Sequence, residues 1–458
     1  MQQRVELTER EINRDLLRPN LTLQLRFFVV VAVCGAIVAM AGGALAYAII
    51  KGVGVYGVNR PVMWGFIIVN FVFWVGISHA GVMLSAILRL AQAEWRRPAT
   101  RAAEVLTMFA LGTAALHPVL HTGRQWRTLY WVFPYDFGRG IWPDIRSPFV
   151  WDPSAIFTYL SGTIMFVFIL LVPDIAVLRD RTTGIMNKVY TFAALGWRGN
   201  ARQWQFQIIA GILLSALILP VFVSVHSIVS WDFAVAIAVE GWHATIFAPY
   251  FVIGAVHSGV ASVITFLAVL RWVFRWESYI RPEHFDALAR LMVVVATAWF
   301  YFLVVDFAMG FYTGEPAEIA LRYAQMGEWP GNMLFIIFMA TGYVLPIPLW
   351  LLKNVRQSPM MMFWSSLFVN IGMWLERYIL IIPSLAKKQS LTFAWGHYAP
   401  SPIEVMLVIG SFALVTLGLV TFCKFFPIIP IYDVKEGRAF EQHIRIGKVN
   451  VPAVFREE

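Results

Sequence analysis

The sequence predicts an all-α polytopic membrane protein with about ten transmembrane helices. Of its 458 residues, 59% are apolar and only 14% are charged, whereas about a quarter of the residues of a soluble domain are charged. The apolar residues also form long blocks, such as 27–50 and 62–90, and each block exceeds the ~20 residues that a helix needs to cross a bilayer. Together, the low charge and the block lengths exclude an ordinary soluble domain.

Ten such blocks follow one another, separated by charged residues or by Pro and Gly. They lie at about residues 27–50, 62–90, 102–120, 153–178, 205–230, 243–270, 287–310, 332–352, 360–382 and 403–424. No signal-peptide cleavage site accompanies the first block, so we expect it to be a retained helix. The blocks divide the chain into a polar segment (1–26), a first helix and loop (27–61), a first four-helix bundle (62–230), a second four-helix bundle (231–382), a last helix with its preceding loop (383–424) and a polar tail (425–458).

The basic residues predict the orientation of these helices. The loops on the side of the N-terminus hold 25 Lys and Arg residues, and the loops on the other side hold 9. Because basic loops stay in the cytoplasm, both termini are expected there. The net charge of +9 then reflects membrane topology, so we expect contact with a lipid bilayer and not with nucleic acid.

An internal repeat indicates how the helices are grouped. Residues 77–82 (ISHAGV) recur as residues 255–260 (AVHSGV), which places His79 and His257 178 residues apart. Four predicted helices separate the copies, so both copies run in the same direction through the membrane. The pattern predicts two parallel four-helix bundles, helices 2–5 and 6–9, flanked by helices 1 and 10.

Several polar residues fall at the span ends that point away from the cytoplasm. They are His117, His121, Arg124, Asp152, His226, Asp232, Glu240 and His243, and Asp306, Glu376 and Arg377 fall at this side too. His117 and His121 share one helix face because they are four residues apart, and Asp152 follows the loop that starts after His121. A histidine titrates near neutral pH and a carboxylate can orient it, so such a pair suits the removal of protons from a quinol. We expect His121 and Asp152 to be catalytic, although Asp152 before Pro153 also fits a helix N-cap.

Other ionisable residues lie within the spans, where each costs roughly 2.5–3.5 kcal/mol on insertion scales. They are His79 and His257 near mid-membrane, Asp174, Asp306, Glu376 and Arg377. We expect all of these except His79 to form a proton path. Structural roles compete with this one, because a buried histidine often hydrogen-bonds a neighbouring helix. Asp174 also fits a solvated helix end, and Glu376 with Arg377 fits an ion pair that lowers the burial cost of both.

Two other chemistries have weaker support. A b-type haem needs paired axial histidines, and the pattern offers His79 with the repeat-related His257, and His243 fourteen residues before His257. A transporter typically has inverted repeats and helices broken at the midplane, whereas this repeat is parallel and no broken helix is evident. Cys34 and Cys423 are the only cysteines, so the chain cannot ligate an iron–sulfur cluster by itself, and no metal site is predicted.

Several motifs together resemble a known family. They are residues 59–65 (NRPVMWG), 70–74 (NFVFW), 77–81 (ISHAG), 146–152 (RSPFVWD), 224–230 (SVHSIVS) and 370–377 (NIGMWLER). With the ten-helix plan, they resemble the NrfD/polysulfide reductase membrane-subunit family (PsrC-like). Within it they look most like ActC, the quinol-binding membrane subunit of alternative complex III. The resemblance runs from about residue 55 to the C-terminus.

The resemblance implies a subunit of a bacterial respiratory or photosynthetic quinol oxidoreductase, embedded in the inner membrane of the cell, that binds menaquinol or ubiquinol near the periplasmic face. Its quinol pocket would lie among helices 2–5, around His121, Asp152, His79, Arg124 and His226, with His117 beside them. Electrons would pass to iron–sulfur clusters of a peripheral subunit and then to c-type haem proteins, with a second NrfD-like membrane subunit in the complex. This chain would bind no haem or iron–sulfur cluster itself. Proton translocation, a companion proton-conducting subunit, a transporter and an anchor without quinol chemistry remain alternatives.

Overall fold

A computed structural model describes residues 8–121, 148–387, 395–439, 441–446 and 449–454. In those residues, ten helices are long and apolar enough to cross a membrane. The spans are α2 (Leu25–Lys51), α3 (Phe66–Leu90), α4 (Thr100–His121), α6 (Pro148–Arg179), α8 (Ala201–Trp231) continued by η5 (Asp232–Ile237), α9 (Phe247–Phe274), α10 (Pro282–Tyr312), α12 (Gly331–Met339) with η6 (Ala340–Val344) and α13 (Pro346–Leu351), α15 (Pro359–Ala386) and α16 (Pro402–Phe425). Each overlaps the block predicted for it, so the all-α fold with ten spans is confirmed.

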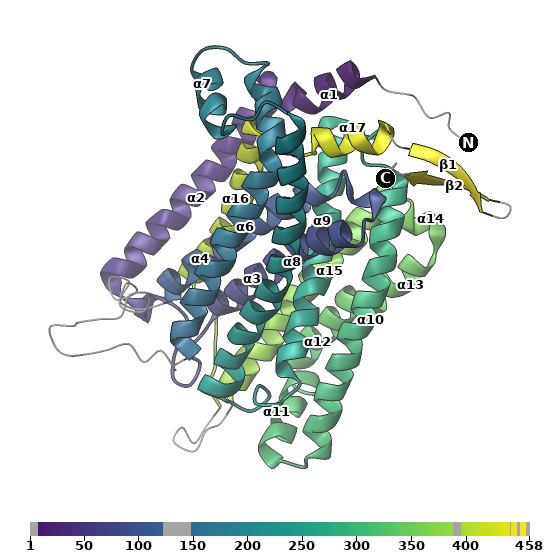
Figure 1. Cartoon of the computed structure of the whole chain (residues 1–458). Helices are drawn as coiled ribbons and strands as arrows, with labels where there is room; N and C mark the ends of the chain where they lie inside the picture. Colours follow the sequence, from purple (N-terminus) through teal and green to yellow (C-terminus); the bar gives the residue numbers. More distant parts are fainter. Residues whose placement is uncertain (1–7, 122–147, 388–394, 440, 447–448, 455–458) are drawn as a thin grey trace.

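Shorter elements lie at the two ends of the bundle. They are α1 (Glu9–Leu21), η1 (Val53–Val55), η2 (Glu94–Arg96), α7 (Gly184–Ala193), α11 (Pro316–Met326), α14 (Lys353–Arg356), α17 (Ile431–Ala439) and an antiparallel hairpin of β1 (Glu441–Ile446) and β2 (Val449–Val454). Figure 1 places α1, α17 and the hairpin at one end and α11 at the other. We call these ends the α1 face and the α11 face. The sequence reasoning did not predict the hairpin.

Helices α3 and α9, which carry the repeated motif, pack directly against each other at the centre of the bundle. Close contacts with a neighbouring helix explain the Gly two residues after each histidine. A Cβ on Gly259 would overlap the Ala80 Cβ, and a Cβ on Gly81 would overlap the Ala103 carbonyl oxygen of α4. Small residues therefore let these helices pack backbone to backbone, as is common in membranes. We call α3, α4, α6 and α8 the first half, and α9, α10, α12–α13 and α15 the second half; their relation by a repeat stays a prediction.

Two spans depart from regular α-helix. The first departure is η5, a π-helical segment at the end of α8, and the second is η6, a π-helical segment between α12 and α13. The span that contains η6 therefore changes its backbone hydrogen-bond pattern locally, although it continues from Gly331 to Leu351. Pro346 lacks the N–H that a continuous helix needs, and π segments occur frequently at functional sites.

Candidate functional site

Two histidines meet in the interior of the first half. His79 of α3 and His226 of α8 are fully buried, and their rings lie edge to face with centroids 4.6 Å apart. Nδ1 of His79 bonds the Val75 carbonyl. In the described part of the chain, Nε2 of His79 and both ring nitrogens of His226 have no hydrogen-bond partner. Because an unpaired buried polar group is unfavourable in an apolar medium, the histidine pair is suited to receive a polar ligand or water.

Two carboxyl groups lie nearer the α11 face than this histidine pair. Asp152 of α6 and Asp232 of η5 interact electrostatically with each other, and each has one buried carboxyl oxygen without a partner among the described residues. Asp232 is six residues beyond His226, and Asp152 is seven residues before Tyr159, whose ring contacts His79. At 1.5 Å of rise per residue, the carboxyls lie about 10 Å along the helices from the histidines. We call His79, His226, Asp152 and Asp232 the His–Asp site.

The N-cap alternative for Asp152 is wrong. Helix α6 begins at Pro148, so Asp152 lies inside the helix instead of before it. The predicted hydropathy block began at residue 153, whereas the helix begins at Pro148 and includes Trp151. The carboxyl of Asp152 is therefore available for a ligand or for Asp232 instead of for the helix terminus.

The remaining predicted residues around the outer loop have different surroundings. His117 is buried; its Nδ1 bonds the Thr113 carbonyl (2.8 Å) and its Nε2 bonds Asn70 (3.0 Å). His121 is half-buried at the end of α4, and its Nδ1 bonds the His117 carbonyl (2.8 Å). No hydrogen bond joins His121 to Asp152 within the described ranges. Arg124 lies outside the described residues.

In the second half, Glu376 and Arg377 of α15 form an ion pair, as the structural alternative for them predicted. The Tyr250 hydroxyl donates to Glu376, and the Arg377 guanidinium lies 5.0 Å from the ring centroid of Phe251. All of these side chains are buried. The pair thus lowers the cost of placing two charges inside the membrane, and Arg377 is also within electrostatic reach of His226 and His257.

A second buried charge cluster stands toward the α11 face of this half. Arg322 of α11 pairs with Asp306 of α10 (2.9 Å) and with Glu318 (3.1 Å). Its guanidinium also lies 4.3 Å from the ring centroid of Phe307. Asp306, predicted as part of a proton path, is therefore held in an internal ion pair. Arg322 and Glu318, which complete the cluster, were not selected from the sequence.

His257 is bonded to the backbone of the span that contains η6. Its Nε2 bonds the Gly342 carbonyl in η6 (3.0 Å), and its ring stacks on Trp299 with centroids 5.3 Å apart. In a π-helical segment the backbone hydrogen bonds join residues five apart instead of four apart. This change can leave a carbonyl oxygen, here that of Gly342, available to His257. His79 contacts His226 instead of His257, so the pairing that the haem hypothesis required is not formed.

Asp174 is not the solvated helix end that one alternative supposed. It is buried, forms an ion pair with Arg101 and accepts hydrogen bonds from the backbone nitrogens of Ile431 (3.3 Å) and Tyr432 (3.4 Å). These contacts fasten α17 across the α1 face. The carboxylate therefore has a structural role here, whereas its predicted role in a proton path is untested.

Asp232 is the main residue of this site to which the sequence reasoning assigned no role, although it placed Asp232 at the outer side of the membrane. Trp231 and Asp232 repeat the dipeptide Trp151 and Asp152, and this repeat is the signal that could have selected Asp232. Tyr159, whose hydroxyl donates to the Ser78 carbonyl (2.9 Å), carried no such signal. Chemically, a carboxyl pair near a buried histidine pair can accept protons in sequence from one bound molecule.

Comparison with known proteins gives one family and several distant relatives. The family described as polysulphide reductase, NrfD, matches residues 54–387. The chain is 22% identical over 412 residues to a putative dimethyl sulfoxide reductase membrane subunit of Halobacterium salinarum, and the match covers 84% of this chain and 88% of the relative. It is 22% identical over 428 residues to the Hdr-like menaquinol oxidoreductase integral membrane subunit of Archaeoglobus fulgidus (90% and 96%). It is 20% identical over 405 residues to a selenate reductase subunit of Mesobacillus selenatarsenatis (83% and 88%).

Proposed function

The chain belongs to the polysulphide reductase NrfD family, and from this premise we propose that it is the quinol-binding membrane subunit of an oxidoreductase complex. Its similarity over 90% of its length to a menaquinol oxidoreductase membrane subunit supports a quinol substrate. The motifs shared with ActC favour an alternative complex III, in which this chain would hold the position of ActC. Menaquinol and ubiquinol are both candidate substrates.

The His–Asp site is the observation that carries this proposal. It places two carboxyls with unpartnered oxygens about 10 Å from two histidines with unpartnered ring nitrogens, counting partners among the described residues. A quinol head group has a hydroxyl at each end, and the site offers a hydrogen-bond acceptor at each end of a separation that a head group with its two hydrogen bonds can bridge. His121 lies on the same face as the carboxyls and would extend the route by which protons leave.

The protons and the electrons that quinol oxidation releases would leave the site by different routes. Oxidation of one quinol releases two protons and two electrons. The hydroxyl at the carboxyl end would give its proton to Asp152 or Asp232, the hydroxyl at the histidine end would give its proton to the His79–His226 pair, and both protons would leave through the carboxyls to the α11 face. The electrons must leave through another chain, because Cys34 and Cys423 cannot ligate an iron–sulfur cluster alone. We therefore propose an iron–sulfur subunit on the α11 face, c-type haem proteins beyond it and a second NrfD-like membrane subunit beside it.

The charge distribution supports an orientation for this arrangement. The α1 face carries the predicted cytoplasmic loops with 25 of the basic residues, so the α11 face would lie toward the periplasm or cell exterior. Both ends of the chain would then be cytoplasmic. Quinol oxidation on the α11 face would release its protons outside and contribute to a proton gradient.

The test is quinol-driven reduction of the electron acceptor by the assembled complex with altered carboxyls. D152N and D232N should each lower the turnover about a hundredfold or more, the lower end of what general acid–base catalysis contributes, while the complex still assembles. H121A should lower it less. D180N is the matched control, because the exposed Asp180 pairs with its neighbour Arg179 at the surface and should leave the turnover unchanged.

Other functions predict different results in the same material. Normal turnover in both D152N and D232N would reject the His–Asp site. A transporter or a companion proton-conducting subunit predicts ion flux in liposomes that contain the isolated chain without quinol. A pure anchor predicts no quinone in the purified complex and no inhibition by quinol analogues.

A further inference from the structure

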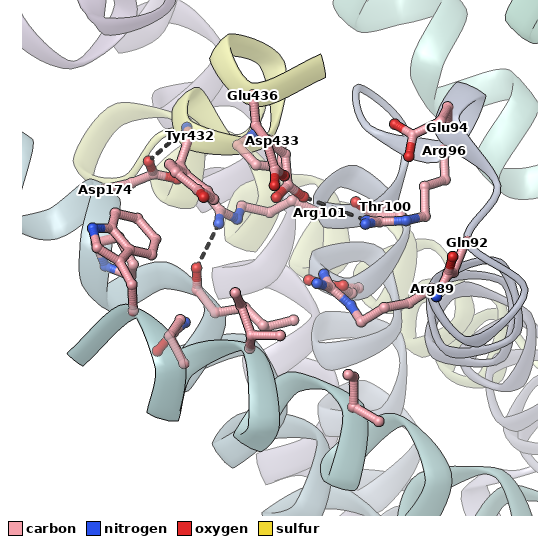
Figure 2. Close-up of a pocket in the computed structure, with 18 residues that line it drawn as sticks. Arg89, Gln92, Glu94, Arg96, Thr100, Arg101, Asp174, Tyr432, Asp433 and Glu436 are labelled. Atoms are coloured by element: carbon pink, nitrogen blue, oxygen red, sulfur yellow. Dashed lines mark hydrogen bonds and ion pairs between the residues drawn. The ribbon is translucent and has the colours of Figure 1, made fainter. Parts of the chain in front are cut away.

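Two cavities on the α1 face differ in the sign of their charge. The first lies between α4, α6, α8 and α17, has a volume of about 280 Å³ and is drawn in Figure 2. Its charged lining residues are Glu94, Glu104, Asp174, Asp433, Glu436, Arg89, Arg96 and Arg101. Because the acidic side chains outnumber the basic ones, this first cavity does not favour an added anion.

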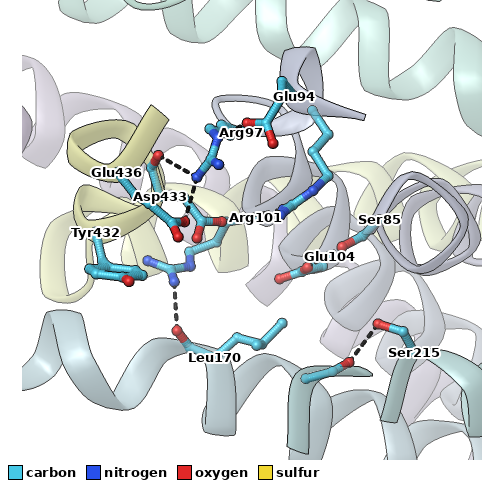
Figure 3. Close-up of polar contacts among 12 residues, drawn as sticks. Ser85, Glu94, Arg97, Arg101, Glu104, Leu170, Ser215, Tyr432, Asp433 and Glu436 are labelled. Carbon is cyan, nitrogen blue, oxygen red and sulfur yellow. Dashed lines mark hydrogen bonds and ion pairs between the residues drawn. The ribbon is translucent and has the colours of Figure 1, made fainter. Parts of the chain in front are cut away.

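Cations around the first cavity are also already paired. Arg97 pairs with Glu94 (2.5 Å) and with Glu436 of α17 (2.7 Å), and Figure 3 shows its guanidinium between these two carboxylates. Arg101 forms an ion pair with Asp174. These charges fasten α17 to the bundle, so they have little capacity to bind a ligand.

The second cavity is basic. It has a volume of about 630 Å³ and lies where the end of α1 and the start of α2 meet the end of α9. Three arginines line it, namely Arg18 of α1, Arg26 of α2 and Arg275 directly after α9. All three are exposed, and none forms an ion pair within the described ranges. We call this cavity the arginine pocket.

Asp15 is the one acidic side chain among the residues that line the arginine pocket, and it is already engaged. Its carboxylate pairs with Arg14 (3.2 Å) and accepts a hydrogen bond from the Tyr279 hydroxyl (3.3 Å). The lining therefore has an excess of two positive charges. An anion that entered the pocket would meet guanidinium groups that are free to bind it.

The place of Arg26 in its helix adds to this charge imbalance. Arg26 lies in the first turn of α2, which has neither an acidic residue nor a side-chain cap there. The positive end of the helix dipole also lies at this turn, so a cation is unfavourable there unless an anion neutralises both. The arginine pocket is therefore better satisfied with an anion bound than without one.

The walls of the arginine pocket are fixed by contacts outside it. The Lys424 ammonium donates to three backbone carbonyls of residues 19–22 (3.2, 3.0 and 3.0 Å), which ties the turn between α1 and α2 to the end of α16. The indole of the buried Trp276 donates to the Asp15 carbonyl (3.4 Å), which ties the end of α9 to α1. Because the pocket is already formed, a ligand would pay little ordering entropy on binding.

Apolar side chains continue from the pocket along the two spans. Leu25 and Val273 line the pocket and are 78% and 50% exposed, and α2 buries few of its side chains. Since α2 and α9 cross the membrane, their ends lie at the depth of lipid head groups. A ligand with an anionic head and apolar chains therefore matches both the arginines and the surface beside them.

We propose that the arginine pocket binds the phosphodiester head group of an anionic phospholipid, with the acyl chains along α2 and the end of α9. Guanidinium groups bind phosphate oxygens through paired hydrogen bonds, and basic pockets between helices on the cytoplasmic side suit anionic head groups. The bound lipid joins α1 and α2 to α9. This inference does not depend on the proposed quinol oxidation.

The first test measures the affinity of the assembled, delipidated complex for phosphatidylglycerol by native mass spectrometry. R18Q, R26Q and R275Q should each weaken binding about fivefold, and the triple variant about a hundredfold, which corresponds to about 1 kcal/mol for each basic residue near an anionic lipid. The matched control is the triple variant R181Q/R198Q/R202Q. It removes the same charge from exposed arginines of the connection around α7, which Figure 1 places at the same face.

Two comparison probes identify the source of the phosphate. Phosphatidylcholine carries a quaternary ammonium beside its phosphate and should bind more weakly than phosphatidylglycerol. Inorganic phosphate lacks acyl chains and should not displace the lipid at equal concentration. Equal losses in the two triple variants, equal affinity for the two lipids, or displacement by inorganic phosphate would overturn the proposal.

The second test needs no variant and so does not depend on how well a variant folds. A phosphatidylglycerol analogue with a photoreactive head group is added to the unaltered complex, and mass spectrometry locates the label. The proposal predicts labelling of residues 18–26 and 271–276, suppressed by excess phosphatidylglycerol but not by phosphatidylcholine. Labelling that spares both segments, or that both lipids suppress equally, would contradict a specific head-group site.

Discussion

Two groups of buried polar residues, one in each half of the membrane domain, are satisfied in different ways. In the second half, Glu376 pairs with Arg377, and Arg322 pairs with Asp306 and Glu318, so only single atoms of these clusters, such as Asp306 Oδ1 and Arg322 Nε, lack a partner in the described residues. In the first half, no ion pair joins the members of the His–Asp site among the described residues, and three of its ring nitrogens and two of its carboxyl oxygens lack partners there. Both halves have the same central helix with its His-x-Gly motif, so the difference lies in the polar groups around that motif.

This difference indicates where chemistry can occur. Charges that are paired internally are already neutralised and hold helices together, whereas unpartnered groups retain the capacity to bind a ligand or exchange a proton. We therefore expect replacement of the paired charges in the second half to affect mainly stability. Replacement of the unpartnered groups of the His–Asp site should affect mainly turnover. Two of the four predictions below test this division and two test the packing around it, in order of decreasing effect on the folded protein.

The largest effect is expected from R322M in the second half. It leaves the buried carboxylates of Asp306 and Glu318 without their cation, and breaking a buried ion pair in this way costs about 3–5 kcal/mol. The measurement is the free energy of unfolding from denaturant titration in detergent. A stable R322M protein that has lost quinol turnover would break the division, because it would assign catalysis to the second half.

Replacing Gly81 of α3 or Gly259 of α9 by alanine should lower the free energy of unfolding by a similar amount. In G259A the new methyl group would overlap Ala80, and in G81A it would overlap the Ala103 carbonyl, so each should lose about 1–3 kcal/mol through overpacking. G112A is the control, because no atom lies within 4 Å of its new Cβ. Unfolding of the three variants under one set of conditions gives the comparison. If G81A and G112A were equally stable, the close packing of α3 on α4 would be rejected.

Replacing a histidine of the first half should separate stability from activity. H226L removes two ring nitrogens that have no partner in the described chain, so the free energy of unfolding should change by less than about 1 kcal/mol. Quinol-driven turnover should fall at least about tenfold. Measuring both quantities on one preparation is essential. A loss of several kcal/mol in H226L would show that His226 is structural, like the charges of the second half.

The smallest effect concerns pH and the attachment of α17. Burial raises the pKa of the Asp433 carboxyl, but Arg89, Arg96, Arg97 and Arg101 outweigh burial and hold it below its ordinary value. A lowered folded-state pKa contributes stability above the ordinary pKa of about 4, and this stability is lost as the pH falls through the folded-state value. Proteolysis within α17 should therefore accelerate several-fold below about pH 4. In D433N the rate should already be raised at neutral pH and depend less on pH.

The sequence predicted the features that hydropathy and charge encode. Ten spans follow from the length of the apolar blocks, and the polar cluster at one face follows from counting helices from the N-terminus. The ion pair of Glu376 and Arg377 was foreseen because the partners are adjacent. The His-x-Gly motif was visible as a repeat, and the structure adds its reason in the contacts of Gly81 and Gly259.

The remaining features depend on which helices face each other. The contact of His79 with His226 joins residues 147 positions apart, and hydropathy does not specify such a pairing. Asp174 looked like a solvated helix end because its partner in α17 follows more than 250 residues later. The π-helical segments η5 and η6 have no local sequence signal of comparable strength to a hydropathy block. Asp232 was not selected although it repeats the Trp-Asp dipeptide.

The most direct test of the central claim is the position of bound quinone in the assembled complex. A photoreactive quinone analogue should label α6 and α8 with η5, near Asp152 and Asp232, and excess unmodified quinone should suppress the label. D232N should weaken labelling, whereas R322M, where it assembles, should leave its position unchanged. Labelling confined to α10 and α15, or labelling that quinone does not suppress, would contradict a quinol site in the first half.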